Sequence, residues 1–261
     1  MNSSALGRPG LIRALTYMMF FIFALTTDAV GVIIPEIIKT FSLSLSQAAT
    51  FHYATMIAIA VSGIGLGFLA DRLGRKRAIF LGLGLFALVC LLFAFGDRFV
   101  YFLCLLVVMG LAVGIFKTAA LALIGDISTN TREHTTTMNL VEGFFGVGAI
   151  VGPALVTWLL TRGVNWTYLY VIAGGLALAI MALASLCPYP QKIGPQQTGR
   201  QRISEGETRI DWLSSLRLVR DPHALWFSAA IALYVMAESA IYVWMPTLLL
   251  DYQGSAMGVA S

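Results

Sequence analysis

The chain has 261 residues, of which 58% are hydrophobic and only 11% are charged, and its mean hydropathy is +0.83. A soluble domain needs about 25% charged residues to cover its surface, so this composition excludes a water-soluble enzyme. The high hydrophobicity also excludes an intrinsically disordered chain. The three cysteines, Cys90, Cys104 and Cys187, lie in or beside apolar stretches with no His or Asp nearby. They therefore predict neither a disulfide framework nor a metal site, and nothing in the sequence indicates a cofactor.

Seven apolar stretches follow one another along the chain, each about as long as a bilayer crossing requires. They cover residues 12–34, 46–70, 77–96, 99–125, 138–161, 166–187 and 224–249. Only a helix satisfies its own backbone hydrogen bonds in lipid without a closed barrel, so we expect an all-α integral membrane protein. The first stretch is interrupted by Asp28 and Pro35 and precedes no small-residue cleavage site, which indicates a permanent helix rather than a signal peptide.

The basic residues are distributed unevenly between the two sides of these seven stretches. Thirteen of the 17 Lys and Arg residues fall on the side of the N-terminus, three fall on the other side, and Lys117 lies inside the fourth stretch. Cytoplasmic loops carry the excess of basic residues, so the N-terminus is predicted to be cytoplasmic, in the plasma (inner) membrane. The net charge of +4 therefore reflects the orientation of the chain in the membrane. The expected partner is membrane lipid and not nucleic acid.

The polar segment 188–223 divides the chain into three predicted parts. Residues 1–187 form a six-helix bundle, residues 188–223 form a cytoplasmic linker, and residues 224–261 form a seventh helix with the start of a second bundle. Within the linker, residues 210–219 place apolar side chains near one helical face with arginines around them. This pattern predicts an amphipathic helix at the membrane surface, with docking on a protein as the alternative.

The short loop between the second and third stretches reads Gly67-Phe68-Leu69-Ala70-Asp71-Arg72-Leu73-Gly74-Arg75-Lys76-Arg77. Its glycines permit a tight turn between antiparallel helices, and Asp71 is an acid among four cations. This segment resembles the helix 2–3 signature of the major facilitator superfamily. The resemblance extends to Gly125-Asp126 with Arg132, similar to the acid–arginine pair beside that signature, and to the G-x-x-x-G-P motif of helix 5.

The resemblance implies a set of residues that control the change between inward and outward conformations. They are Gly67, Asp71, Arg72, Gly74, Arg75, Asp126, Arg132, Glu142, Gly148, Gly152 and Pro153. Two departures disfavour multidrug efflux: Ala154-Leu155-Val156-Thr157 lacks a double glycine, and Leu106 stands where drug–proton antiporters carry an arginine.

A narrower resemblance, to the fucose–proton symporter branch, rests on residues 139–149 and 234–247. Residues 114–120 resemble the helix 4 motif of that branch, but Lys117 stands where the branch commonly has Glu. A lysine ordinarily stays protonated. A fixed cation in the cavity would favour an anionic solute over the neutral sugar that the branch implies.

Four ionisable residues lie at membrane depth, where each costs about 2.5–3.5 kcal/mol on insertion scales. Asp28, about 10 Å from the outer end at Pro35, is a candidate for proton or cation coupling, or else a packing acid. Lys117, about 26 Å deep, is a candidate solute site or a lysine that reaches back to the cytoplasmic surface. Glu142 suits gating or packing.

Glu238 is the fourth, one turn from Tyr234 and Tyr242. An acid and aromatic rings on one face suit a hydroxylated ligand, although Tyr234 and Trp244 also fit a core or an interfacial belt. We place these residues, with Asp28 and Lys117, in the predicted site for solute and coupling ion. His52 is expected at the membrane interface.

Two classes of function fit these patterns. The first is a secondary transporter of a small polar solute, a sugar or an organic anion, coupled to protons or another cation. The second is a non-transporting scaffold or sensor on the same fold. A transporter of this superfamily has two six-helix halves, so we interpret the chain as truncated, with its partner being the missing half or a second copy. No enzymatic activity is expected.

Overall fold

The computed structural model describes residues 9–187 and 222–249. Its helices are α1 (Pro9–Thr27), α2 (Val30–Phe41), α3 (Leu45–Leu66), α4 (Leu69–Arg72), α5 (Arg75–Leu92), the 3₁₀ turn η1 (Phe93–Phe95), α6 (Phe99–Ile127), α7 (Thr131–Thr161), α8 (Thr167–Ser185) and α10 (Pro222–Leu248). Within the described residues, 7 helical stretches are long and apolar enough to cross a membrane. The predicted all-α membrane fold is confirmed.

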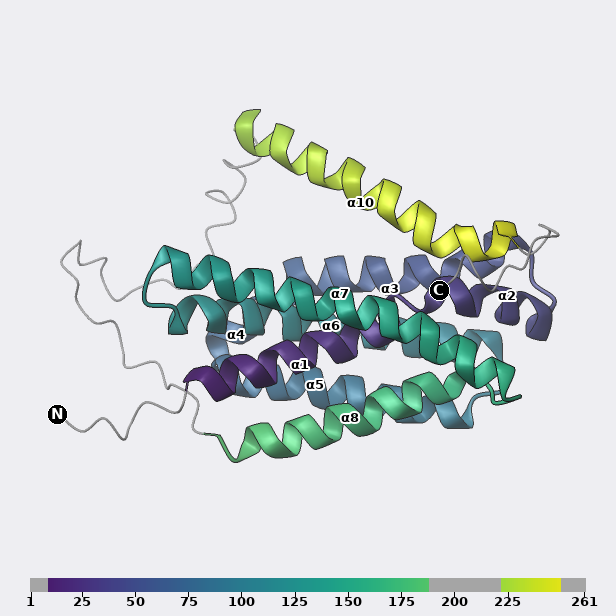
Figure 1. The fold of residues 1–261 in the computed structure, drawn as a ribbon, viewed down its shortest axis with the longest axis horizontal. Helices are drawn as coiled ribbons and strands as arrows, with labels where there is room; N and C mark the ends of the chain where they lie inside the picture. The colour runs from purple at the N-terminus through teal and green to yellow at the C-terminus, as the bar shows by residue number, and fades with distance from the viewer. Residues whose placement is uncertain (1–8, 188–221, 250–261) are drawn as a thin grey trace.

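The helices of residues 9–187 lie side by side in one bundle (Figure 1). α6 packs against both α3 and α5, α1 packs against α7 and α8, and α8 also packs against α5. The interior is filled by aliphatic and aromatic side chains from all of these helices. α10 differs, because it contacts chiefly α2 and diverges from the bundle toward its own N-terminal end (Figure 1).

The first membrane span is broken at Asp28 and not at Pro35, and it continues to Phe41. Two turn residues, Asp28 and Ala29, separate α1 from α2. Pro35 lies inside α2, five residues after its start, where the missing N–H removes a single backbone hydrogen bond. The predicted end at residue 34 is therefore wrong, and the span is about two turns longer.

Local capping explains two further boundaries that the apolar pattern misplaced. α7 begins at Thr131 and not at residue 138, because the Asn130 side chain accepts a hydrogen bond from the backbone N–H of Glu133. α3 begins at Leu45 with a capping box between Ser44 and Gln47. It ends at Leu66, and the short α4 follows where the second stretch was predicted to run to residue 70.

The two ends of the bundle are built from different side chains. The end that carries the α2–α3 turn, here called the aromatic end, is packed with rings: Phe41, Phe51, Phe93, Phe99, Phe102, Trp166 and Tyr170. The opposite end, here called the ion-paired end, is held by salt bridges. Arg75 pairs with Asp71 and Asp126, and Arg13 pairs with Glu133. Most of the predicted linker, with its amphipathic segment, and the residues after 249 lie outside the described residues.

Candidate functional site

Lys117 lies in α6 with its ammonium between α1 and α7. Its Nζ atom is 4.6 Å from the centre of the Phe145 ring and 6.0 Å from that of Phe20, so both rings make cation–π contacts. Among the described residues no carboxylate forms a direct ion pair with Lys117, but Glu142 and Asp28 both interact with its charge. The lysine is therefore held by aromatic faces, with two acids acting on it from a distance.

Asp28 lies deeper than the sequence predicted. Its helical span ends at Phe41, 13 residues further on, which is about 20 Å along a helix, compared with the expected 10 Å. Thr27 donates a hydrogen bond of 2.7 Å from Oγ1 to the Asp28 carboxylate. The difference in depth from Lys117 shrinks to roughly 6 Å, which accounts for the electrostatic interaction between them.

The three aromatic residues predicted on α10 differ in burial, because α10 approaches the bundle only toward its C-terminal end (Figure 1). Tyr242 and Trp244 are half-buried and pack against the core, whereas Tyr234 is 65% exposed and Glu238 is exposed. Glu238 still acts electrostatically on Asp28 and Tyr242. Tyr242, Glu238 and Asp28 therefore interact electrostatically with one another, whereas Tyr234 is exposed and takes no part in these interactions.

His52 was expected at the membrane interface, and it is instead 3% exposed. Its ring lies 5.8 Å from that of Tyr242 in an edge-on arrangement. The Nδ1 atom has no hydrogen-bond partner among the described residues. A single sequence gives no signal for this contact, because it depends on α10 meeting α3 across nearly 200 residues of chain.

The loop motif forms an ion-paired cluster centred on Arg75. The guanidinium donates at 2.9 Å to Asp71 from Nη1 and at 2.9 Å to Asp126 from Nε. Gly74 precedes α5 with a φ of +83°, a conformation that favours glycine. Arg72 lies over the ring of Phe68 at 5.2 Å. The predicted proximity of Asp126 to the loop motif holds, but its partner is Arg75 and not Arg132.

The glycines of the predicted motifs lie at close contacts between helices. A Cβ atom at Gly148 or Gly152 would collide with the backbone carbonyl oxygen of Phe21 or Leu25 in α1. One at Gly67 would lie 3.3 Å from the Thr118 side chain and 2.9 Å from the Gly63 oxygen. Pro153 follows within α7. Gly148 and Gly152 bring α7 close to α1, which positions Phe145 over Lys117.

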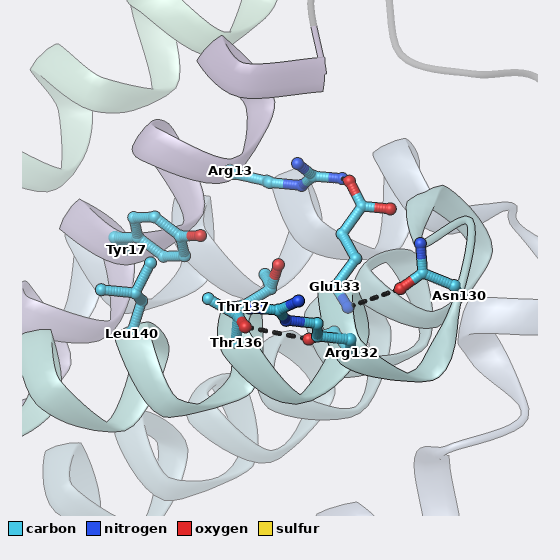
Figure 2. Close-up of a pocket in the computed structure, with 8 residues that line it drawn as sticks. All are labelled: Arg13, Tyr17, Asn130, Arg132, Glu133, Thr136, Thr137 and Leu140. Carbon is cyan, nitrogen blue, oxygen red and sulfur yellow. Dashed lines mark hydrogen bonds and ion pairs between the residues drawn. The ribbon is translucent and has the colours of Figure 1, made fainter.

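An open hollow of about 350 Å³ lies at the ion-paired end between α1 and α7 (Figure 2). It is lined by Arg13, Tyr17, Asn130, Arg132, Glu133, Thr136, Thr137 and Leu140. Arg13 donates to Glu133 and to the Ile127 carbonyl oxygen, and Thr129 donates to the same carboxylate. Sequence analysis missed Arg13 and Tyr17 as site residues, because their partners lie more than 100 residues away. In the described part of the chain, no cluster of three His, Cys, Asp or Glu side chains suits a metal ion.

Comparison with known proteins decides the family. A family model of the Major Facilitator Superfamily matches residues 16–261. The chain belongs to this superfamily. It is a multi-pass membrane protein of a transporter family, and the resemblance seen in its motifs is confirmed at that level.

Several members of the superfamily are similar to the chain at low identity. A TsgA homolog of Edwardsiella ictaluri is 26% identical over 94% of the chain and 59% of its own length. Multidrug resistance protein 2 of Bacillus subtilis is 26% identical over 78% and 49%. A gallate transporter of Pseudomonas putida is 24% identical over 92% and 58%. The chain thus spans roughly half of the length of these relatives.

Solved structures share the fold at lower identity. A bacterial homolog of the human lysosomal transporter Spinster, in an inward-facing and unoccupied conformation, has a TM-score of 0.71 at 16% identity, over 96% of this chain and 57% of the other. A D-xylose–proton symporter has a TM-score of 0.65 at 15% identity, over 95% and 63%. These similarities show the fold.

Proposed function

We propose that the protein containing this chain is a secondary transporter that moves a small polar solute by alternating access. The observation that carries the proposal is Lys117, a cation at membrane depth held by Phe145 and Phe20 while Asp28 and Glu142 act on its charge. Ionisable groups are expensive in lipid and mark solute or ion pathways in membrane proteins. In transporters with repeated halves the solute site lies near the bilayer midplane, and Lys117 lies four residues, or about 6 Å, from the middle of α6.

The solute is an organic anion, or a sugar that carries an acidic group, rather than a neutral sugar. A lysine close to two aromatic rings, with no direct ion pair to a carboxylate among the described residues, presents a positive charge to a ligand. The similarity to a gallate transporter supports an anion, and the similarity to a D-xylose–proton symporter supports coupling to protons. Asp28 and Glu238 are the proposed coupling acids, and Tyr242 interacts electrostatically with both. Trp244 and Tyr234 are proposed at the edge of the site.

Two finer assignments belong to the same proposal. The resemblance of residues 139–149 and 234–247 to the fucose–proton symporter branch supports the proposal of a symporter of the inner membrane. The excess of basic residues at the ion-paired end supports a cytoplasmic N-terminus. The residues of the loop motif, with Glu142, Gly148, Gly152 and Pro153, are proposed to control the change in conformation.

Uptake into proteoliposomes with Lys117→Glu and Lys117→Gln tests the proposal, with gallate and D-xylose as probes and an imposed pH gradient. If the lysine binds the anionic group, both variants will weaken apparent affinity for gallate by about tenfold, corresponding to about 1.4 kcal/mol. Lys39→Gln is the control, since Lys39 is exposed and pairs with Glu36 alone among the described residues. Unchanged affinity and pH dependence in both Lys117 variants would make Lys117 structural. Absence of any transport by the folded protein would favour a scaffold or sensor.

A further inference from the structure

Two arginines from different helices line one hollow at the ion-paired end (Figure 2). Arg13 comes from the first turns of α1, and Arg132 comes from the first turn of α7. The hollow lies between these helices, and its wall also includes the hydroxyl-bearing side chains of Tyr17, Thr136 and Thr137. Its volume of about 350 Å³ falls at the lower end of the range for small-ligand sites, about 300–1,000 Å³.

The charges that line the hollow do not balance. Glu133 is the only carboxylate in the wall, and Arg13 is bonded to it. Arg132 forms no ion pair with any described residue, and its predicted partner Asp126 is bonded to Arg75 instead. The Nε atom of Arg13 is buried and has no hydrogen-bond partner among the described residues. Among the described residues of the wall, one positive charge is therefore in excess, and no described carboxylate pairs with the Arg132 guanidinium, whose N–H groups suit an oxyanion.

Side-chain contacts between α1 and α7 connect the wall of the hollow to the aromatic residues around Lys117. Tyr17 lines the hollow, and its ring stacks on Phe144 with centres 5.4 Å apart. The next residue, Phe145, carries the ammonium of Lys117 on its face. Along α1 the distance from Arg13 to Phe20, the second ring at Lys117, is seven residues, or about 10 Å. The arginines of the hollow and Lys117 thus lie at two levels along the same interface between α1 and α7.

We propose that this hollow is a second solute site, which binds the carboxylate or phosphate group of a small dissolved anion at the ion-paired end of the route to Lys117. Arg132 supplies the charge, the hydroxyl groups of Tyr17 and Thr137 supply neutral donors, and the Tyr17 ring with Leu140 contacts the apolar part of the solute. That the bound anion is the transported solute rests on the proposed function above. The binding of an oxyanion rests on the hollow alone.

Protection of a thiol inside the hollow measures this binding without transport. The protein, with Cys104→Ser to remove its exposed cysteine, carries Thr136→Cys and is alkylated in phosphatidylcholine nanodiscs. Inorganic phosphate and acetate are the probes, against sodium chloride at equal ionic strength. The matched control is Thr161→Cys, at the other end of α7, because both threonines donate only to a carbonyl oxygen of their own helix.

We expect both probes to slow alkylation at Thr136→Cys and to leave Thr161→Cys unchanged. Adding Arg132→Gln should raise the probe concentration needed for protection about tenfold, since one charge-assisted contact is lost. Arg162→Gln, which removes an arginine stacked on Trp158 near the opposite end of α7, should not change it.

Equal alkylation rates with and without the probes would overturn the proposal, and so would protection that survives Arg132→Gln. Protection only in nanodiscs that contain phosphatidylglycerol would also overturn it, because the occupant would then be a lipid headgroup. If the dissolved anions protect the thiol but no transport occurs, the hollow binds anions as proposed and the transport function fails.

Discussion

The two ends of the bundle hold the same helices together by different physical means. At the aromatic end Phe93 stacks on Tyr170 with ring centres 3.9 Å apart, and Trp166 meets Phe102 at 5.1 Å. At the ion-paired end Arg75 joins Asp71 and Asp126, and Arg13 joins Glu133. Aromatic packing depends on close complementary surfaces, whereas partly exposed ion pairs are weak and exchange partners readily.

This difference indicates that the aromatic end contributes most to the stability of the bundle and that contacts at the ion-paired end change more easily. Five of the seven rings at the aromatic end are buried, so separating them would expose a large apolar area. The carboxylates at the ion-paired end are partly exposed to water, so their pairs contribute little to stability. In the proposed transport cycle, the ion-paired end is the end whose contacts can change.

Removing an aromatic ring should give the largest effect on stability. Phe93 is 1% exposed, and Phe93→Ala should lower the free energy of unfolding by about 3–5 kcal/mol, since a large cavity forms. Phe95 lies in the same 3₁₀ turn but is 79% exposed, so Phe95→Ala should change it little. Unfolding in mixed micelles, followed by tryptophan fluorescence, measures both. Equal effects of the two variants would contradict the assignment of stability to the aromatic end.

Removing the cap of α7 should give an intermediate effect at the ion-paired end. Asn130→Ala loses the side-chain bond to the Glu133 backbone N–H, which should destabilise the protein by about 1 kcal/mol. Asn130→Asp keeps an acceptor and should stay near the wild type. Asn139→Ala is the control, because it makes the same substitution at an exposed position within α7 that does not cap the helix. A loss as large for Asn139→Ala as for Asn130→Ala would show that the cap does not fix the start of α7.

Neutralising the loop acid should have the smallest effect on stability and a selective effect on rate. Asp71 is exposed, so Asp71→Asn should change the free energy of unfolding by less than about 1 kcal/mol. Because Arg75 then keeps only Asp126, uptake should slow while equilibrium binding of the solute is unchanged. Asp97→Asn, in the loop at the aromatic end, is the control. Weakened binding with normal uptake at saturating solute would refute the gating role of Asp71.

The membrane spans could be predicted from the sequence because bilayer thickness imposes a length on every apolar stretch. Their ends could not be predicted as well. The start of α7 is set by Asn130 and lies seven residues before the apolar pattern begins, since a capped polar helix needs no apolar residues. The end of the first span was also misplaced, at Pro35, because that proline lies inside α2 and costs it a single backbone hydrogen bond while the span continues to Phe41.

The charged residues of the candidate site could be predicted from the sequence, but their neighbours in space could not. Asp28, Lys117, Glu142 and Glu238 are visible in the sequence as charges in apolar stretches, and the structure links them electrostatically. The aromatic neighbours of Lys117 and the ion pair of Arg13 were not predictable. They depend on how α1 and α7 pack, which follows from Gly148 and Gly152 meeting the α1 backbone.

The contact at Gly31 determines how α10 rests on the bundle. A Cβ atom there would collide with the carbonyl oxygen of Tyr242 and lie 3.2 Å from the Cα atom of Val243, so the two helices meet backbone against backbone. The absent side chain at Gly31 lets α10 lie closer to α2 than any larger residue would allow. Any residue larger than glycine would wedge the helices apart at this point, and the ring of Tyr242 would lose its place beside His52.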